Sequence, residues 1–205
     1  MAFSIPALDT LIHELTGLPG IGEKTAQRLA FFILKSGKDY SERLRMALDA
    51  VQLQVHYCPQ CFAFTDQELC RICSSVDRNK TQVCVVEEAS DVIRIEAAGT
   101  FKGLYHVLQG TISPLDGVAP SDLRIHELVE RIHDSQLDPV NPIREVILAL
   151  DADLEGDTTS LYLARLLHPK NIKLTRIAHG VPFGSDIDYI DQRTLGRAME
   201  NRVEL

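Results

Sequence analysis

The stretch Val146-Ile-Leu-Ala-Leu150-Asp151-Ala-Asp153-Leu-Glu155-Gly156-Asp157 decides the fold of this chain. Its apolar first half predicts a buried strand, which ends in two carboxylates one residue apart. Because the side chains of a strand alternate between its two faces, we expect Asp151 and Asp153 to point the same way. A second apolar run, Val83-Cys-Val-Val86, ends in Glu87. Three carboxylates at the ends of two adjacent strands would suit a divalent cation in phosphoryl transfer.

Residues 80–177 alternate between apolar runs and amphipathic segments, the pattern of an α/β sheet domain. We predict strands over residues 83–87, 103–108, 146–150 and 172–178, and helices over residues 90–98, 121–133 and 158–167. This order favours a mostly parallel sheet covered on both faces. Ligand-binding groups gather at the carboxyl ends of such strands, where the three carboxylates fall. A single acid there can instead cap a helix, the role we assign to Asp157, while Ser90 is the predicted N-cap of the first helix.

Two motifs in this region resemble those of the Toprim domain found in topoisomerases, primases and some nucleases. Val85-Val-Glu87-Glu88-Ala-Ser-Asp91 is similar to its first motif, and the stretch from Asp151 to Asp157 to its Asp-x-Asp motif. The resemblance implies a Toprim fold over residues 80–177. It leaves open a metal-dependent nuclease or nicking enzyme that uses Glu87, Asp151 and Asp153. Against an enzyme, the sequence offers no obvious nucleophile or general base, and 205 residues leave no room for the tyrosine domain of a topoisomerase.

Residues 1–55 are predicted to be a helical module. Helices are expected over residues 6–15, from residue 23 onward and over residues 41–55, with Ser41 as the N-cap of the third. The segment between the first two helices, Leu18-Pro-Gly-Ile-Gly22, cannot continue a helix. Together with the Glu-Lys-Thr-Ala-Gln-Arg sequence that follows, it resembles a helix-hairpin-helix motif.

The predicted hairpin has the features of a phosphate-binding turn. Gly20 and Gly22 let the backbone turn tightly and approach a partner closely. Free N–H groups at the start of the next helix then suit a phosphate oxygen. Lys24 and Arg28 share one helical face, so they would add phosphate contacts that depend on salt but not on base sequence. The alternative is a plain helical hairpin with a glycine-rich turn; we favour DNA binding.

Residues 56–79 contain a cysteine quartet, Cys58-Pro-Gln-Cys61 and Cys70-Arg-Ile-Cys73. Paired Cys-x-x-Cys turns supply the tetrahedral thiolate ligands that zinc prefers. A chain without an export signal keeps its thiols reduced, which disfavours two disulfides or a redox pair. With all four positions taken by cysteine, the predicted site holds one structural zinc ion and no catalytic water. The fifth cysteine, Cys84, lies within an apolar strand and is predicted to be a core residue.

Composition and charge limit the classes of function. The chain is 45% apolar and 24% charged, with no apolar run long enough to cross a bilayer. No basic residue precedes Lys24, so we expect no secretory signal, a cytoplasmic location and no membrane partner. The net charge of −8 is uneven, because residues 1–80 are balanced and the whole excess of acid lies in residues 81–205. A DNA-facing surface is therefore expected near the N-terminus, while the acidic remainder suits a metal ion or a basic protein partner.

The order of the three modules is itself a signal. A helix-hairpin-helix, a four-cysteine site and a Toprim domain within 205 residues resemble the RecR family of recombination mediators. Further similarity lies in Gly103-Leu-Tyr-His-Val-Leu108, Arg176-Ile-Ala-His-Gly-Val-Pro182 and Thr194-Leu-Gly-Arg197. The resemblance covers essentially the whole chain. It implies an α/β fold in several modules, in which residues 178–205 form a C-terminal helical segment used in packing and assembly.

The resemblance also implies a function. Members of the family are bacterial repair proteins that catalyse no reaction and associate with the nucleoid when they act. They form tetrameric rings able to encircle DNA, single- or double-stranded and of any sequence. With RecO, and in some settings RecF, they help load RecA on single strands. Carried over to this chain, the hairpin residues named above would face DNA, and the three strand-end carboxylates would contact RecO.

Two departures from the family pattern stand out. The first acid of the Asp-x-Asp pair is often lost in the family but is present here as Asp151, which leaves weak Mg²⁺ binding open. Phe183 and Ser185 stand where smaller residues are usual, which concerns local packing only. A zinc-dependent DNA-binding adaptor without ring assembly is a further alternative. The sequence does not decide between dimer and tetramer, between RecO and RecF, or among DNA structures.

Overall fold

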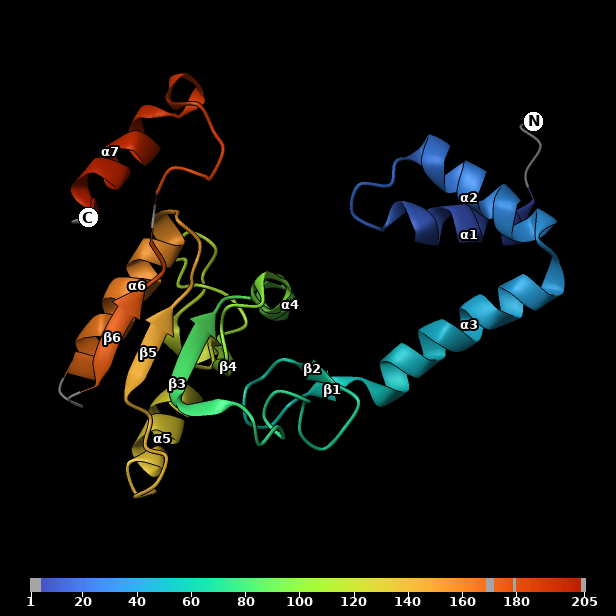
Figure 1. Cartoon of the computed structure of the whole chain (residues 1–205). Coiled ribbons are helices and arrows are strands. Elements are labelled where there is room, and N and C mark those ends of the chain that lie inside the picture. The colour runs from blue at the N-terminus through green and yellow to red at the C-terminus, as the bar shows by residue number, and fades with distance from the viewer. Residues whose placement is uncertain (1–4, 169–171, 179, 204–205) are drawn as a thin grey trace. The chain divides into compact units, whose positions relative to one another are not determined.

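The computed structural model describes residues 5–168, 172–178 and 180–203 (Figure 1). Residues 1–4, 169–171, 179 and 204–205, which belong to the predicted modules, lie outside the described part. The chain divides into two compact units, Met1–Val55 and His56–Leu205. The first unit is helical, and the second contains the cysteine quartet, the sheet and the C-terminal segment. The predicted multi-module α/β fold is confirmed.

The helical unit consists of α1 (Pro6–Thr16), α2 (Glu23–Lys35) and α3 (Gly37–Gln54). Proline begins α1, where its missing N–H has no cost. The prediction that Ser41 caps the third helix is wrong. Gly37 adopts a left-handed φ of 81° and turns the chain directly after α2, so α3 begins four residues earlier. Ser41 lies inside α3, and its hydroxyl donates to the carbonyl of Gly37.

The second unit opens with a short antiparallel pair, β1 (His56–Tyr57) and β2 (Phe64–Thr65). The rings of Tyr57 and Phe64 stack across it, 5.1 Å between centroids. This pair and the loop through residue 75 form a small knuckle with little apolar interior of its own. Its buried cysteines pack instead against the sheet that follows.

The sheet has the strand order β4-β3-β5-β6, and every neighbouring pair is parallel. Its strands are β3 (Asn79–Val86), β4 (Gly103–Val107), β5 (Glu145–Leu148) and β6 (Lys173–Arg176). The connecting helices are α4 (Ala89–Ala98), α5 (Ile125–Ser135) and α6 (Leu154–Leu167). The mostly parallel sheet was therefore predicted correctly, with strand ends displaced by a few residues.

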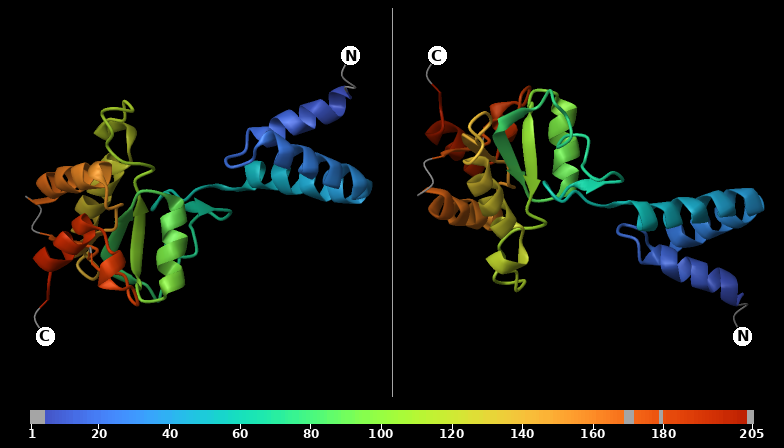
Figure 2. Two further views of the ribbon diagram at one scale, coloured as in Figure 1. Left: turned by 90° about the horizontal axis from the view of Figure 1, so that it is seen from above. Right: turned by 90° about the horizontal axis from the view of Figure 1, so that it is seen from below.

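Alternate residues of β3 enter two different cores, because strand side chains point to opposite faces in turn. Val83 and Val85 pack with α5 and α6 on one face. Cys84 and Val86 face α4 and the cysteine knuckle on the other face, so the prediction that Cys84 is a core residue is confirmed. Figure 2 shows α4 and α6 on opposite sides of the strands.

Three helix starts in the second unit also differ from the prediction. The N-cap of α4 is Glu88 rather than Ser90, and the N–H of Glu88 donates to Asp91 Oδ2 at 2.9 Å. A 3-10 turn, Pro120–Asp122, precedes α5, which therefore begins at residue 125. Helix α6 begins at residue 154 rather than 158. Its N-cap is Asp153, whose Oδ1 accepts the N–H of Gly156 at 2.8 Å, so the assignment of Asp157 as the cap is wrong.

The C-terminal segment contains a 3-10 turn, Ile187–Tyr189, and helix α7 (Gln192–Glu200). Asp191 caps α7 by accepting the N–H of Thr194 at 2.9 Å. The predicted C-terminal helical segment is thus present. No helix in the described part of the chain is both long enough and apolar enough to span a bilayer.

Gly156 should be sensitive to any added side chain, because a Cβ on it would lie 2.2 Å from the backbone oxygen of Asp151. We expect Gly156→Ala to lower the free energy of unfolding by about 1–3 kcal/mol, since α6 must shift to relieve the overlap. Gly196 in α7 is the matched control, with no atom within 4 Å of its added Cβ. Gly196→Ala should stabilise by about 0.5–1 kcal/mol. Urea unfolding measures both, and a Gly156→Ala protein as stable as the parent would contradict the expectation.

Candidate functional site

The four cysteines of the quartet meet in one cluster. Their sulfur atoms all lie within 4.8 Å of one another, and Cys61 Sγ and Cys70 Sγ are 3.5 Å apart. The first Cys-x-x-Cys turn is closed by Phe62, which adopts a left-handed φ of 63° and donates its N–H to the carbonyl of Cys58. The N–H of Cys58 in turn donates to the carbonyl of Ala63 at 2.8 Å. Backbone geometry therefore fixes two thiols before any ion is considered.

Two of the thiol sulfurs accept backbone N–H groups, and the thiols affect one another's ionisation. The N–H of Cys70 donates to Cys58 Sγ at 3.5 Å, and the N–H of Cys73 donates to Cys70 Sγ at 3.4 Å. Hydrogen bonds from Cys61 and Cys73 lower the pKa of Cys70. Hydrogen bonding to Cys61 and Cys70 raises the pKa of Cys73. Ionisation of one thiol thus hinders that of its neighbour, so a fully ionised cluster needs a cation at its centre.

The cluster fits a tetrahedral thiophilic ion. Zinc–sulfur bonds of about 2.3 Å place the four sulfurs about 3.8 Å apart, close to the separations found here. Three of the thiols are buried and the fourth is half-buried, so no ligand position is open to bulk water. Such a set would hold a structural ion rather than a catalytic one.

The knuckle and two arginines outside it satisfy backbone groups along the β4 edge of the sheet. Strand β4 is an edge strand, and three of its backbone groups find partners outside the sheet. Val107 donates its N–H to the carbonyl of Cys61 at 2.8 Å. The carbonyl of Tyr105 accepts Arg131 Nη1 at 2.6 Å, and that of Gly103 accepts Arg78 Nη1 at 3.3 Å. An edge satisfied in this way is a poor template for pairing with another chain.

Glu87, Asp151 and Asp153 lie beyond the carboxyl ends of β3 and β5, but strand alternation does not place the two aspartates there. Strand β5 ends at Leu148, so Asp151 and Asp153 lie in the loop that leads to α6. Glu87 Oε1 accepts the N–H of Asp151 at 2.7 Å and thereby ties the end of β3 to this loop. Asp153 is occupied as the N-cap of α6. Two of the three acids thus have structural hydrogen bonds.

The carboxyl group of Glu87 is a weaker acid than usual. Burial raises its pKa to about 7, and the nearby charges of Asp151, Asp153 and Asp91 act in the same direction. Among the described residues, the cysteine cluster is the one group that brings three or more ligand atoms close enough for a single ion. The structure therefore does not support the Mg²⁺ site that the sequence left open.

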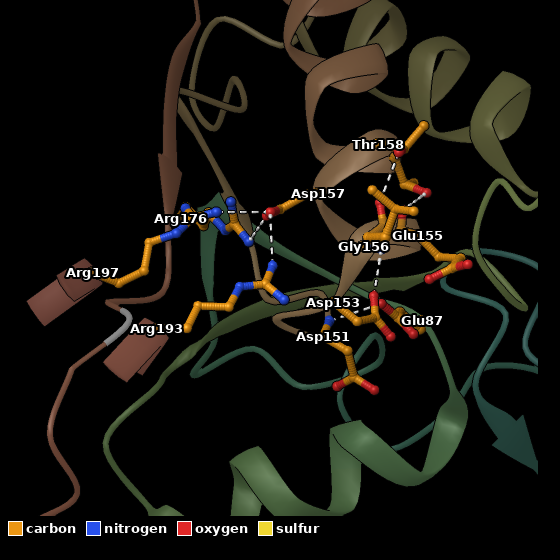
Figure 3. A network of polar contacts seen from close by, with 12 residues as sticks. Glu87, Asp151, Asp153, Glu155, Gly156, Asp157, Thr158, Arg176, Arg193 and Arg197 are labelled. Carbon is orange, nitrogen blue, oxygen red and sulfur yellow. Dashed lines mark hydrogen bonds and ion pairs between the residues drawn. The ribbon is translucent and has the colours of Figure 1, made fainter. Parts of the chain in front are cut away.

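Asp157 has a different role from the neighbouring acids. Figure 3 shows its carboxylate among three arginines. Arg176 of β6 donates to Oδ1 at 2.5 Å, Arg197 of α7 donates to Oδ2 at 3.0 Å, and Arg193 lies 4.0 Å from Oδ2. Hydrogen bonding from Arg176 is the largest cause of the lowered pKa of Asp157. This ion-pair network fastens α7 to α6 and β6.

The predicted DNA-binding residues lie at the hairpin turn and on the first two turns of α2. Gly20 adopts a left-handed φ of 78°, and Gly22 is the N-cap of α2 without any capping side chain. The N–H groups of Glu23 and Lys24 have no acceptor among the described residues. Lys24 and Arg28 are exposed on the first turns of α2, and neither forms an ion pair within the described part of the chain. This arrangement can accept an oxyanion from solution.

Sequence reasoning missed two sets of residues. The arginines around Asp157 carry one weak signal, the four-residue spacing of Arg193 and Arg197 on a helix. No sequence pattern marks Arg131, because its hydrogen-bond partners, Gln60 and Tyr105, lie far away in the sequence.

Family models match four consecutive regions of the chain. Three describe parts of RecR: its helix-hairpin-helix (residues 8–52), its zinc finger domain of the four-cysteine type (residues 55–75) and its C-terminal region (residues 180–203). The fourth describes a Toprim domain and matches residues 81–178.

Curated relatives match over nearly the full length. The recombination protein RecR of Bdellovibrio bacteriovorus is 58% identical over 201 residues, which are 98% of each chain. That of Chloroherpeton thalassium is 51% identical over the whole of both chains, and that of Herpetosiphon aurantiacus 49% identical over 95% of this chain and 93% of its own. The chain belongs to the RecR family of recombination proteins.

Proposed function

We propose that this chain is a DNA-binding mediator of recombinational repair that catalyses no reaction. The observation that carries the proposal is the hairpin, where N–H groups without an acceptor and two cations without an ion pair among the described residues lie within the first two turns of α2. The printed names of its relatives, all recombination proteins, point to the same process. A protein of this kind works on chromosomal DNA and hence in the bacterial cytoplasm.

Binding at the hairpin would be electrostatic and independent of base sequence. The free N–H groups of α2 and the side chains of Lys24 and Arg28 all suit phosphate oxygens. Contacts to phosphates carry no direct information about base sequence. Gly20 and Gly22 carry no side chain that would hold the backbone away from a phosphate. The balanced charge of residues 1–50 also leaves this end free of the acidic excess found downstream.

The strand-end carboxylates are proposed as a docking surface for RecO, with RecF as a further partner and RecA loading as the outcome. Asp151 is exposed, and it lies beside Glu87 and Asp153 at one edge of the sheet. A basic side chain of a partner would relieve the mutual repulsion of these acids. The metal-dependent nuclease that would use the same residues is not favoured, because two of the three acids hold backbone N–H groups.

The helical unit supports self-association. Within its described residues only Ala26 and Ala30 are buried, too few for three helices to form a core. Along α3 the stripe of Leu44, Leu48 and Val51 is exposed, with Leu48 62% accessible. Unpaired apolar helix faces of this kind mark an interface. A second copy of the chain is the proposed partner, within the tetrameric ring that the family resemblance implies.

The cysteine cluster is proposed to hold one structural zinc ion through Cys58, Cys61, Cys70 and Cys73. Bound there, the ion would supply cross-links that replace a hydrophobic core, which a knuckle of about 20 residues cannot build.

DNA binding should be lost when the charge at the hairpin is reversed. Lys24→Glu with Arg28→Glu should abolish association with DNA in low salt, and milder Lys24→Gln with Arg28→Gln should flatten the salt dependence of log K by about 1.8 units on duplex DNA. The matched control is Lys35→Glu with Lys38→Glu, the same charge change at exposed positions away from the turn. Fluorescence anisotropy gives both quantities. Equal binding by the hairpin variant and the control would reject the hairpin as the DNA contact.

Self-association should depend on the stripe of α3. Light scattering of the parent chain should give a multiple of 22.9 kDa. Leu48→Glu with Val51→Glu should reduce that mass, because two charges would be buried in the interface. Leu115→Glu with Val140→Glu changes two exposed apolar residues of the second unit and should leave the mass unaltered. A monomeric parent chain at micromolar concentration would contradict the assembly proposal.

Metal binding should require the quartet and not the fifth cysteine. The parent chain and Cys84→Ala should each carry one zinc ion, whereas Cys58→Ser should carry none. Chelation should lower the melting temperature of the parent, because the metal-free knuckle loses its cross-links. Elemental analysis and thermal unfolding provide the measurements. A parent chain that is metal-free as purified, and equally stable with added zinc, would refute the site.

A further inference from the structure

Arg131 lies at the junction of α5, β4 and the cysteine knuckle. Its Nη1 donates to the carbonyl of Tyr105 in β4 at 2.6 Å and to the carbonyl of Gln60, inside the first Cys-x-x-Cys turn, at 3.2 Å. The side chain is only partly exposed, and Nη2 is shut off from solvent without a hydrogen-bond partner among the described residues.

No carboxylate of the described residues forms an ion pair with this cation. Of the neighbouring acids on α5, Glu127 pairs with Arg124 at 2.8 Å, and Glu130 and Asp134 lie 3.4 Å from His126 and His133, which carry charge only when protonated. Within the described part of the chain Arg131 itself forms no ion pair. A guanidinium taken out of water without a counter-charge is costly, so its position needs an explanation.

The cysteine cluster offers a counter-charge, because Arg131 Nη1 contacts the carbonyl of Gln60, which lies between Cys58 and Cys61. Burial lowers the pKa of Arg131, and the negative charge of the cysteines, Cys73 foremost, acts in the opposite direction. Four thiolates around a divalent ion keep two net negative charges in a site that excludes water. A single buried cation next to them offsets part of that charge, and the cluster offsets the cost of burying the cation.

We propose that Arg131 is the counter-charge of the metal-loaded cysteine cluster and couples metal binding to the docking of the knuckle on β4. The inference rests on the proposed occupancy of the cluster by a divalent ion. Arg131 touches no ligand sulfur; it is a positioning residue that acts through charge and through the Gln60 carbonyl. The same guanidinium holds the knuckle to the sheet, so occupancy of the cluster stabilises both the metal site and the edge of β4.

The test separates charge from hydrogen bonding. Arg131→Lys keeps the positive charge but loses the planar guanidinium group. Arg131→Gln keeps an N–H donor but loses the charge. Zinc affinity of the full chain, measured by competition with a chromophoric chelator, should fall by about 10–100-fold in Arg131→Gln and by less than about tenfold in Arg131→Lys. Arg165→Gln, an exposed arginine of α6 with no partner among the described residues, should bind as the parent does.

A spectroscopic measurement excludes a merely structural role. Replacing zinc by Co²⁺ gives a sulfur-to-cobalt charge-transfer band, whose energy depends on how strongly the sulfur electrons are stabilised. Loss of the nearby cation in Arg131→Gln should move this band to longer wavelength, while Arg131→Lys leaves it in place. If Arg131→Gln does not fold, the test uses Arg131→Lys alone. A shifted Co²⁺ band in Arg131→Lys, or a loss of more than about tenfold in its zinc affinity, then overturns the inference.

The outcomes also distinguish this inference from the proposed metal site. A parent chain that takes up no zinc overturns both. Zinc uptake by the parent, with equal affinity in Arg131→Gln and Arg131→Lys, overturns the role of Arg131 alone. Lower affinity in Arg131→Gln than in Arg131→Lys, together with the band shift, supports it.

Discussion

The mutual dependence of the cysteine knuckle and the edge strand β4 underlies the second unit. The knuckle has almost no core of its own, and without it the N–H of Val107 in the edge strand β4 would lack a partner. The N–H of Val107 meets the carbonyl of Cys61, and Arg131 joins the carbonyls of Gln60 and Tyr105. Each partner thus supplies what the other lacks, and the proposed metal ion would stabilise the sheet as well as the knuckle.

The carboxyl ends of the central strands β3 and β5 carry carboxylates that resemble an active site. Their geometry has a structural basis in this chain: Glu87 binds the loop after β5, Asp153 caps α6, and Asp157 binds the arginines of β6 and α7. Asp151 is the member whose carboxylate stays exposed without such a task. Acids with these assignments suit a binding surface better than a catalytic centre.

Periodicity and spacing predicted what is local, and failed where distant residues decide. Apolar runs located all four strands of the sheet, and the Cys-x-x-Cys spacing located the cluster, because both signals lie within a few residues. The start of α6 was placed four residues late, since nothing in the sequence tells which of two acids becomes the cap. The contacts of Arg131 could not be predicted from the sequence, because one of them joins residues that are 71 positions apart.

The position of the knuckle before the sheet in the chain has a consequence for the order of events during synthesis. Cys73 leaves the ribosome well before β4 and α5, and a nascent chain grows by about 5–20 residues each second. For several seconds the four thiols therefore have neither the edge of β4 nor the charge of Arg131 beside them. In this interval capture of the proposed metal ion would compete with oxidation of the thiols, and the knuckle would dock on β4 only afterwards.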